Sequence, residues 1–228
     1  MKDLTRHIEL LISRYPVLEE SKQDIEKAYS VLEKCYETKH KVLIAGNGGS
    51  AADAEHIVGE LMKGFKLSRK PDMGFASKLI EKDEELGRVL AENLQGALPA
   101  IALDGHVALS TAYMNDCEPL LCFAQQVNGY GEEGDVFFGI STSGNSKNVL
   151  YAAVTAHAKG MKVIGLTGGV GSGKSLVAQF LKEETGAELI LTDDVGHIVT
   201  DKGGSAFEAV LERFGNDILS DTGEIDRK

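Results

Sequence analysis

The segment 168–175 has the residue types and the spacing of a phosphate-binding loop. Gly168, Gly173, Lys174 and Ser175 fill the pattern G-x-x-x-x-G-K-[ST], directly after the apolar run 163–166. Glycine allows the tight turn in which successive backbone N–H groups point at phosphate oxygens. The lysine can reach the outer phosphates of a nucleotide, and the serine hydroxyl can ligate Mg²⁺. The segment therefore predicts phosphate or nucleotide binding.

A second candidate phosphate site lies upstream, in a turn rich in hydroxyl groups. Ser141, Thr142, Ser143 and Ser146 follow the apolar run 135–140 and precede a segment with helical spacing. Their hydroxyls and the N-terminal amides of the next helix suit a phosphate monoester that is recognised without an arginine or a metal. Helix capping by serine and threonine is the alternative interpretation. Four hydroxyls within six positions favour the phosphate site.

His56 and Glu60 form a third constellation, four residues apart in a predicted helix. Residues at this spacing lie on one helical face, so both side chains can meet a single ligand or a Zn²⁺ ion. Taken by itself, such a pair is more often an ordinary surface pair.

Apolar runs predict the strands that position these residues. They alternate with segments of helical spacing, an order typical of a parallel, doubly wound α/β sheet. The predicted strands are 41–45, 99–103, 135–140, 161–166 and 188–191. The predicted helices are 3–14, 18–38, 51–63 and 149–159, with 64–98 as a charged, partly helical insertion. The hydroxyl-rich and glycine-rich turns follow the C-terminal ends of strands, where open α/β sheets bind ligands.

The composition indicates an ordinary globular protein. Of the 228 residues 43% are hydrophobic and 26% charged, and the formal net charge is −11. This acidity disfavours general nucleic-acid or membrane-surface binding, and no apolar run reaches the ~20 residues of a membrane span. We expect a cytoplasmic location, because the first residues lack a signal-peptide pattern. Cys35, Cys117 and Cys122 are expected to be reduced thiols, with a metal ligand or a reactive thiol as the alternative.

The motifs GNGGSAADAEH (46–56) and GISTSGNSKNVLYA (139–152) resemble the sugar-isomerase (SIS) fold, specifically its phosphoheptose isomerase branch. The resemblance covers about residues 1–167. It implies an enzyme that interconverts sedoheptulose 7-phosphate and a heptose phosphate. The residues that would hold the phosphate are Ser141, Thr142, Ser143 and Ser146, and those that would line the sugar site are Asn47, Ser50 and Asp104.

The same resemblance implies how catalysis would proceed. Glu60 matches the glutamate that moves a proton between adjacent sugar carbons in that family, and His56 and Glu60 would belong to its Zn²⁺ site. The family completes this site with a glutamine and a histidine on a C-terminal helix, and nothing after Gly168 matches that helix. We therefore expect an isomerase site that is impaired or altered. SIS relatives build their sites across subunit contacts, so the resemblance also implies a homo-tetramer.

The stretch 161–228 resembles the start of dephospho-CoA kinase, through MKVIGLTGGVGSGKSLVAQFL and LILTDDVGHIV. This second resemblance implies ATP and Mg²⁺ as ligands. Gly168, Gly171, Gly173, Lys174 and Ser175 would hold the nucleotide, and Asp193 would accept or orient the hydroxyl proton of the acceptor. The later strands and the lid of that kinase have no counterpart here. We expect a SIS domain over 1–160 and a truncated kinase-like segment over 161–228 that shares its sheet, joined as a fusion.

Three functions thus stay open on the sequence. The leading one is a sugar-phosphate isomerase or a sugar-phosphate-binding SIS protein. The second is an ATP-binding module of the dephospho-CoA kinase type. The third is a non-catalytic SIS module that acts through oligomer contacts.

Overall fold

The computed structural model describes residues 4–64, 68–168, 188–191, 203, 207–215, 219–220 and 223–225. The chain divides into two compact units. Unit 1 comprises residues 1–30, 141–146 and 164–228, and unit 2 comprises residues 31–140 and 147–163.

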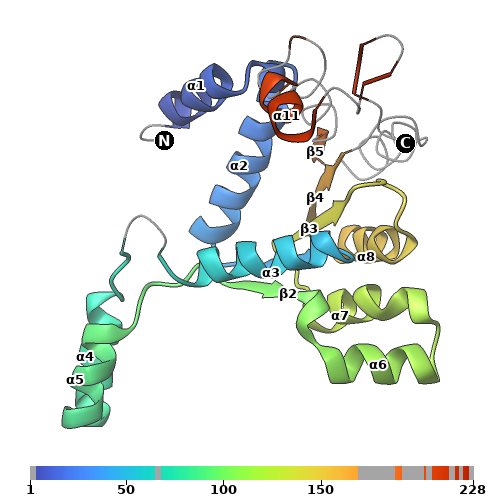
Figure 1. Ribbon diagram of the computed structural model, residues 1–228. Coiled ribbons are helices and arrows are strands. Elements are labelled where there is room, and N and C mark those ends of the chain that lie inside the picture. Colours follow the sequence, from blue (N-terminus) through green and yellow to red (C-terminus); the bar gives the residue numbers. More distant parts are fainter. Residues whose placement is uncertain are drawn as a thin grey trace. The chain divides into compact units, whose positions relative to one another are not determined.

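The strands of the sheet follow the order β2-β1-β3-β4-β5 (Figure 1). The pairs β1–β2, β1–β3 and β4–β5 are parallel. Val42 of β1 lies opposite Ala100 of β2 and Val136 of β3, and Ile164 of β4 lies opposite Glu188 of β5. The bounds are β1 (Val42–Ala45), β2 (Ala100–Ala102), β3 (Val136–Ser141), β4 (Lys162–Thr167) and β5 (Glu188–Leu191). Every residue of β1 is buried, as expected for a strand with neighbours on both sides. The predicted parallel sheet is confirmed, and no strand end differs from its predicted position by more than one residue.

Unit 2 covers its strands with helices rich in small side chains. Helix α3 (Gly49–Met62) packs on β1 and β2, and α7 (Cys122–Tyr130) packs on α8 (Lys147–Ala158) (Figure 1). The buried side chains of α8 are Val149, Ala152, Ala153 and Ala156. Short alanine side chains let neighbouring elements approach closely. The remaining elements are η2 (Leu103–Gly105), α6 (Val107–Asp116) and η3 (Pro119–Leu121).

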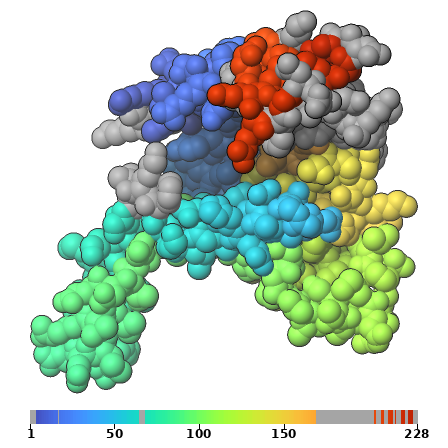
Figure 2. Space-filling model, in the orientation of Figure 1, coloured from blue at the N-terminus to red at the C-terminus, as the bar shows by residue number. Residues whose placement is uncertain are grey.

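The predicted insertion 64–98 is a helical hairpin of α4 (Met73–Lys82) and α5 (Glu84–Asn93). The carboxylate of Asp72 caps α4, and that of Asp83 accepts a hydrogen bond from Leu86 N–H and caps α5. At its base, Arg69 donates to the carbonyl oxygens of Leu61 and Gly96, at 2.6 and 2.7 Å. In the space-filling view the hairpin protrudes as a lobe of its own (Figure 2).

Unit 1 contains α1 (Leu4–Arg14), η1 (Pro16–Glu19) and α11 (Phe207–Phe214). An isolated antiparallel bridge joins Leu219 to Ile225. Helix α2 (Lys22–Glu37) contributes residues to both units. Within the described part of the chain, no helix is long and apolar enough to cross a membrane.

The three cysteines are free thiols with different exposures, and this predicts their reactivity. Cys117 is exposed, whereas Cys35 and Cys122 are buried. Burial, and then the charge of Asp135, raise the pKa of Cys35 to about 11, so its thiolate is scarce at neutral pH. In the native protein a chromogenic thiol reagent should label Cys117 fast and Cys35 only after unfolding. Mass spectrometry of the labelled peptides checks this, and fast labelling of Cys35 would contradict it.

Candidate functional site

The turn after β1 brings Asn47 to the carboxyl end of the sheet. Gly46 and Gly48 make the turn possible: a Cβ on Gly46 would overlap the backbone of Ser50, and Gly48 has φ of +57°. Helix α3 then begins at Gly49. Ser50, in the first turn of α3, is 7% exposed.

Asn47 faces Asn148 across the boundary between β1 and β3. Each side-chain amide donates to the oxygen of the other, with Nδ2–Oδ1 distances of 3.0 and 2.8 Å. A sheet of order 2-1-3-4-5 has its topological switch point between β1 and β3, where ligands of open α/β sheets bind. Sequence reasoning assigned no role to Asn148. The sequence feature that could have pointed to Asn148 is its position just after the hydroxyl-rich turn.

In unit 1, the hydroxyls of the loop 141–146 converge. Ser141 Oγ lies 2.8 Å from Ser146 Oγ and 3.4 Å from Ser143 Oγ. Ser143 Oγ also accepts from Asn145 N–H, at 3.2 Å, and Gly144 takes φ of +62° to close the turn. Thr142 is exposed. The loop thus gathers three of the four predicted hydroxyls into one cluster of donors, as a phosphate monoester requires.

Glu60 lies one turn after His56 on α3. Its Oε1 is 3.6 Å from Lys63 Nζ, and its Oε2 is buried without a hydrogen-bond partner in the described part of the chain. A buried acceptor without a partner is costly unless a ligand supplies a donor or a proton. His56 is exposed.

These two side chains do not make a zinc site by themselves. A catalytic Zn²⁺ needs three protein ligands. Among the residues that the structure describes, no cluster of three histidine, cysteine, aspartate or glutamate side chains could hold a metal ion. The predicted zinc site at His56 and Glu60 therefore lacks a third ligand within these residues.

Asp104 follows β2 and lies against α3. Its Oδ1 is buried without a partner in the described residues. Burial raises the pKa of Asp104, and the nearby charge of Glu55 raises it further, against opposing effects of its own backbone N–H and of His106. The surroundings of Asp104 thus disfavour the charged form of its carboxyl group, which is common for groups at ligand-binding sites.

Asp104→Asn should raise the stability of the folded protein at neutral pH. A carboxyl with a raised pKa binds its proton more tightly in the folded state, so its ionisation lowers stability as pH rises through that pKa. The melting temperature of the variant should exceed that of the wild type at pH 7, and the difference should vanish near pH 3. Thermal melts of both proteins between pH 3 and pH 7 measure this difference in melting temperature. A difference that grows as the pH falls would contradict the prediction.

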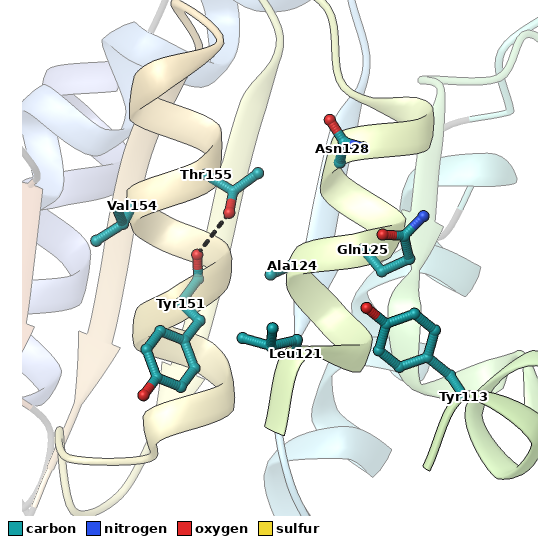
Figure 3. Close-up of a pocket in the computed structure, with 8 residues that line it drawn as sticks. All are labelled: Tyr113, Leu121, Ala124, Gln125, Asn128, Tyr151, Val154 and Thr155. Carbon is teal, nitrogen blue, oxygen red and sulfur yellow. Dashed lines mark hydrogen bonds between the residues drawn. The ribbon is translucent and has the colours of Figure 1, made fainter. Parts of the chain in front are cut away.

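A groove of about 300 Å³ lies between α7 and α8 (Figure 3). Tyr113, Tyr151 and Val154 are among the side chains that line it. Its wall contains none of the predicted site residues, nor any carboxylate or imidazole group. We therefore do not assign the chemistry to this groove.

The nucleotide loop lies largely outside the described residues. Gly168 is described and buried. Gly171, Gly173, Lys174, Ser175 and Asp193 fall outside the described ranges, so their roles stay predictions.

Comparison with known proteins agrees with both resemblances. The SIS domain model matches residues 9–97 and 86–168. The phosphoheptose isomerase of Clostridium acetobutylicum is 36% identical over 186 residues, which cover 78% of this chain and 82% of that protein. The chain belongs to the SIS-domain family, in its phosphoheptose isomerase branch. The dephospho-CoA kinase model matches residues 162–228. The predicted domain boundary at 160–161 stays a prediction.

Other members of the family match over similar lengths. Phosphoheptose isomerase of Coxiella burnetii is 34% identical over 74% of this chain, and this chain spans 66% of the length of that relative. The solved phosphoheptose isomerase of Neisseria gonorrhoeae has a TM-score of 0.56 and 29% identity, over 82% of this chain and 85% of that one. For the Francisella tularensis enzyme the TM-score is 0.53 and the identity 32%, over 77% and 81%.

Proposed function

We propose that this SIS-domain chain isomerises a ketose phosphate to an aldose phosphate, with sedoheptulose 7-phosphate as the substrate. The observation that carries the proposal is the convergence of the hydroxyls of Ser141, Ser143 and Ser146 in the loop after β3. A cluster of neutral donors at the end of a parallel strand suits the phosphate of a sugar. The family relationship supports the same substrate class.

The site residues take separate roles in this proposal. Asn47 and Asp104 bind sugar hydroxyls, since both offer hydrogen-bonding groups at strand ends. The carboxylate of Glu60 removes a proton from C1 of the ketose, which leaves an enediol, and returns a proton to C2. A second group, outside these residues, donates a proton to the C2 carbonyl oxygen and takes up the proton of the C1 hydroxyl when the aldehyde forms.

Calorimetry with the purified chain tests substrate binding. Sedoheptulose 7-phosphate should bind, and Ser141→Ala should weaken it by about tenfold, since a hydrogen bond to a charged group contributes about 1.5–3 kcal/mol. Ser77→Ala is the matched control: Ser77 Oγ only donates to the carbonyl oxygen of Met73, on the exposed α4. Equal loss in both variants, or no binding by the wild type, would overturn the proposal.

We further propose that the chain assembles as a homo-tetramer, and that residues 1–38 take part in the contacts. Helix α1 supports this, because its apolar positions recur at helical spacing while only Ile8 is buried in it. Light scattering of the chain with and without residues 1–38 tests the assembly. A particle that still contains four chains after the deletion would contradict the role of these residues.

A kinase-like activity is the second candidate, favoured by the match of residues 162–228 to the dephospho-CoA kinase model. It predicts Mg²⁺-dependent binding of ATP that is lost in Lys174→Ala. Binding of a fluorescent ATP analogue, with and without Mg²⁺, tests it. Retention of sugar-phosphate binding in the same variant would separate the two candidates.

A further inference from the structure

The paired amides of Asn47 and Asn148 bridge two segments that lie 101 residues apart in the chain. Asn47 is in the turn after β1, and Asn148 is in the first turn of α8, which follows β3. Because β1 and β3 pair in parallel, these segments meet at the same edge of the sheet. Both residues belong to unit 2.

Hydrogen bonding fixes which way each amide points. The oxygen of Asn148 accepts from Val149 N–H, at 3.0 Å, so the Nδ2 group of Asn148 must be the side that donates to Asn47. A side-chain amide has two N–H donors and one oxygen with two lone pairs. Asn148 Oδ1 accepts two hydrogen bonds and is saturated. Asn47, which is exposed, keeps one N–H and one lone pair for a ligand.

We propose that Asn148 is a positioning residue for the sugar, acting through Asn47. Its amide holds the Asn47 amide in one orientation, so that the remaining N–H and the remaining lone pair of Asn47 are presented in fixed directions. One donor and one acceptor so placed match a pair of neighbouring sugar hydroxyls, each of which can donate and accept. This inference rests on the proposed sugar-phosphate function.

A double-mutant cycle in steady-state kinetics separates positioning from direct contact. Asn148→Ala should raise KM for sedoheptulose 7-phosphate by about tenfold, the equivalent of one lost hydrogen bond at the upper end of the usual range, and leave kcat within about twofold. In the Asn47→Ala background the same substitution should raise KM no further. Asn115→Ala, on the exposed face of α6, is the control and should behave as the wild type. Additive effects, or an unchanged KM in Asn148→Ala, would overturn the inference.

Asn148→Asp separates orientation of Asn47 from capping of α8. Aspartate keeps an oxygen for Val149 N–H but cannot donate to Asn47 Oδ1. The added charge should weaken the binding of inorganic phosphate and of the sugar phosphate equally. Loss of the fixed orientation of the Asn47 amide should weaken the binding of the sugar phosphate alone. An equal loss for both ligands would assign Asn148 to capping alone and reject the inference.

A measurement on the protein without sugar distinguishes failure of the positioning role of Asn148 from failure of the proposed function. In ¹⁵N-labelled protein, the side-chain amide signals of Asn47 should exchange slowly with water in the wild type and fast in Asn148→Ala. If the wild type neither binds nor converts the sugar phosphate, the proposed function fails and the sugar role of Asn148 fails with it. If the wild type is active but Asn47 exchanges equally fast in both proteins, only the positioning role fails.

Discussion

Glu60→Gln is expected to lower kcat of sugar-phosphate isomerisation by about 10²–10⁴-fold, the usual contribution of a general base. Glutamine has nearly the same shape as glutamate, but its amide cannot accept the proton from the substrate carbon. The structure places Oε2 of Glu60 in a buried position without a hydrogen-bond partner in the described residues, so its lone pairs are not used by another group there. KM should change far less than kcat, because the amide still fits the site.

Lys63→Met is the matched control for this prediction. Lys63 is the described ion-pair partner of Glu60, and its side chain is 60% exposed. An ion pair whose lysine is this exposed contributes little to stability. The lysine variant should keep nearly full activity. If Lys63→Met loses as much kcat as Glu60→Gln, the ion pair and not proton transfer would explain both effects.

Asp135→Ala is expected to lower the free energy of unfolding by about 3–5 kcal/mol, the range for breaking a buried ion pair. Asp135 is fully buried just before β3, where its carboxylate accepts hydrogen bonds from the backbone N–H groups of Lys41 and Glu132, at 3.0 and 2.9 Å. It also lies 2.7 Å from Lys41 Nζ and 3.5 Å from His40 Nδ1. Alanine would leave two backbone donors and a half-buried ammonium group without this partner.

Urea unfolding at pH 7 measures the effect, with Glu132→Gln as the control. The Glu132 side chain is 77% exposed and lies 3.2 Å from the same ammonium group, so its loss should cost under 1 kcal/mol. Burial lowers the pKa of Lys41, but the hydrogen bonds to Asp135 and Glu132 outweigh this effect and raise the pKa above its ordinary value. The contribution of the charged Lys41 should therefore persist at neutral pH and be lost as the pH rises into strong alkali. An unfolding midpoint of Asp135→Ala equal to that of the control would contradict this role.

The sequence predicts the strands and the positions of the two turns that follow β1 and β3 well, because both depend on local features. The apolar run of β1 ends at a glycine turn, and β3 ends at the serines of 141–146, which the structure confirms. Pairs of distant residues were not predictable. Asp135 and Lys41 are 94 residues apart, as Asn47 and Asn148 are 101 apart. Only the parallel pairing of β1 with β3 brings them together, and no local periodicity encodes that pairing.

The helical hairpin of α4 and α5 was predicted in part from the sequence. The capping residues Asp72 and Asp83 are visible in the sequence, yet the segment was predicted only as partly helical. Many of its apolar side chains are exposed, among them Met73 at 84% and Leu86 at 63%. Each of the two helices is only 10 residues long, so helical spacing recurs over fewer than three turns before the chain reverses.

Proton exchange in D₂O is the most direct test of the central claim, that this chain is a sugar-phosphate isomerase with Glu60 as its base. Purified protein, incubated with sedoheptulose 7-phosphate in D₂O, should place deuterium on the sugar carbons between which the proton moves. Glu60→Gln should abolish this incorporation, and Lys63→Met should retain it. NMR detects the label even when net conversion is slow. No deuterium in the sugar with the wild-type chain, or equal incorporation with Glu60→Gln, would contradict the claim.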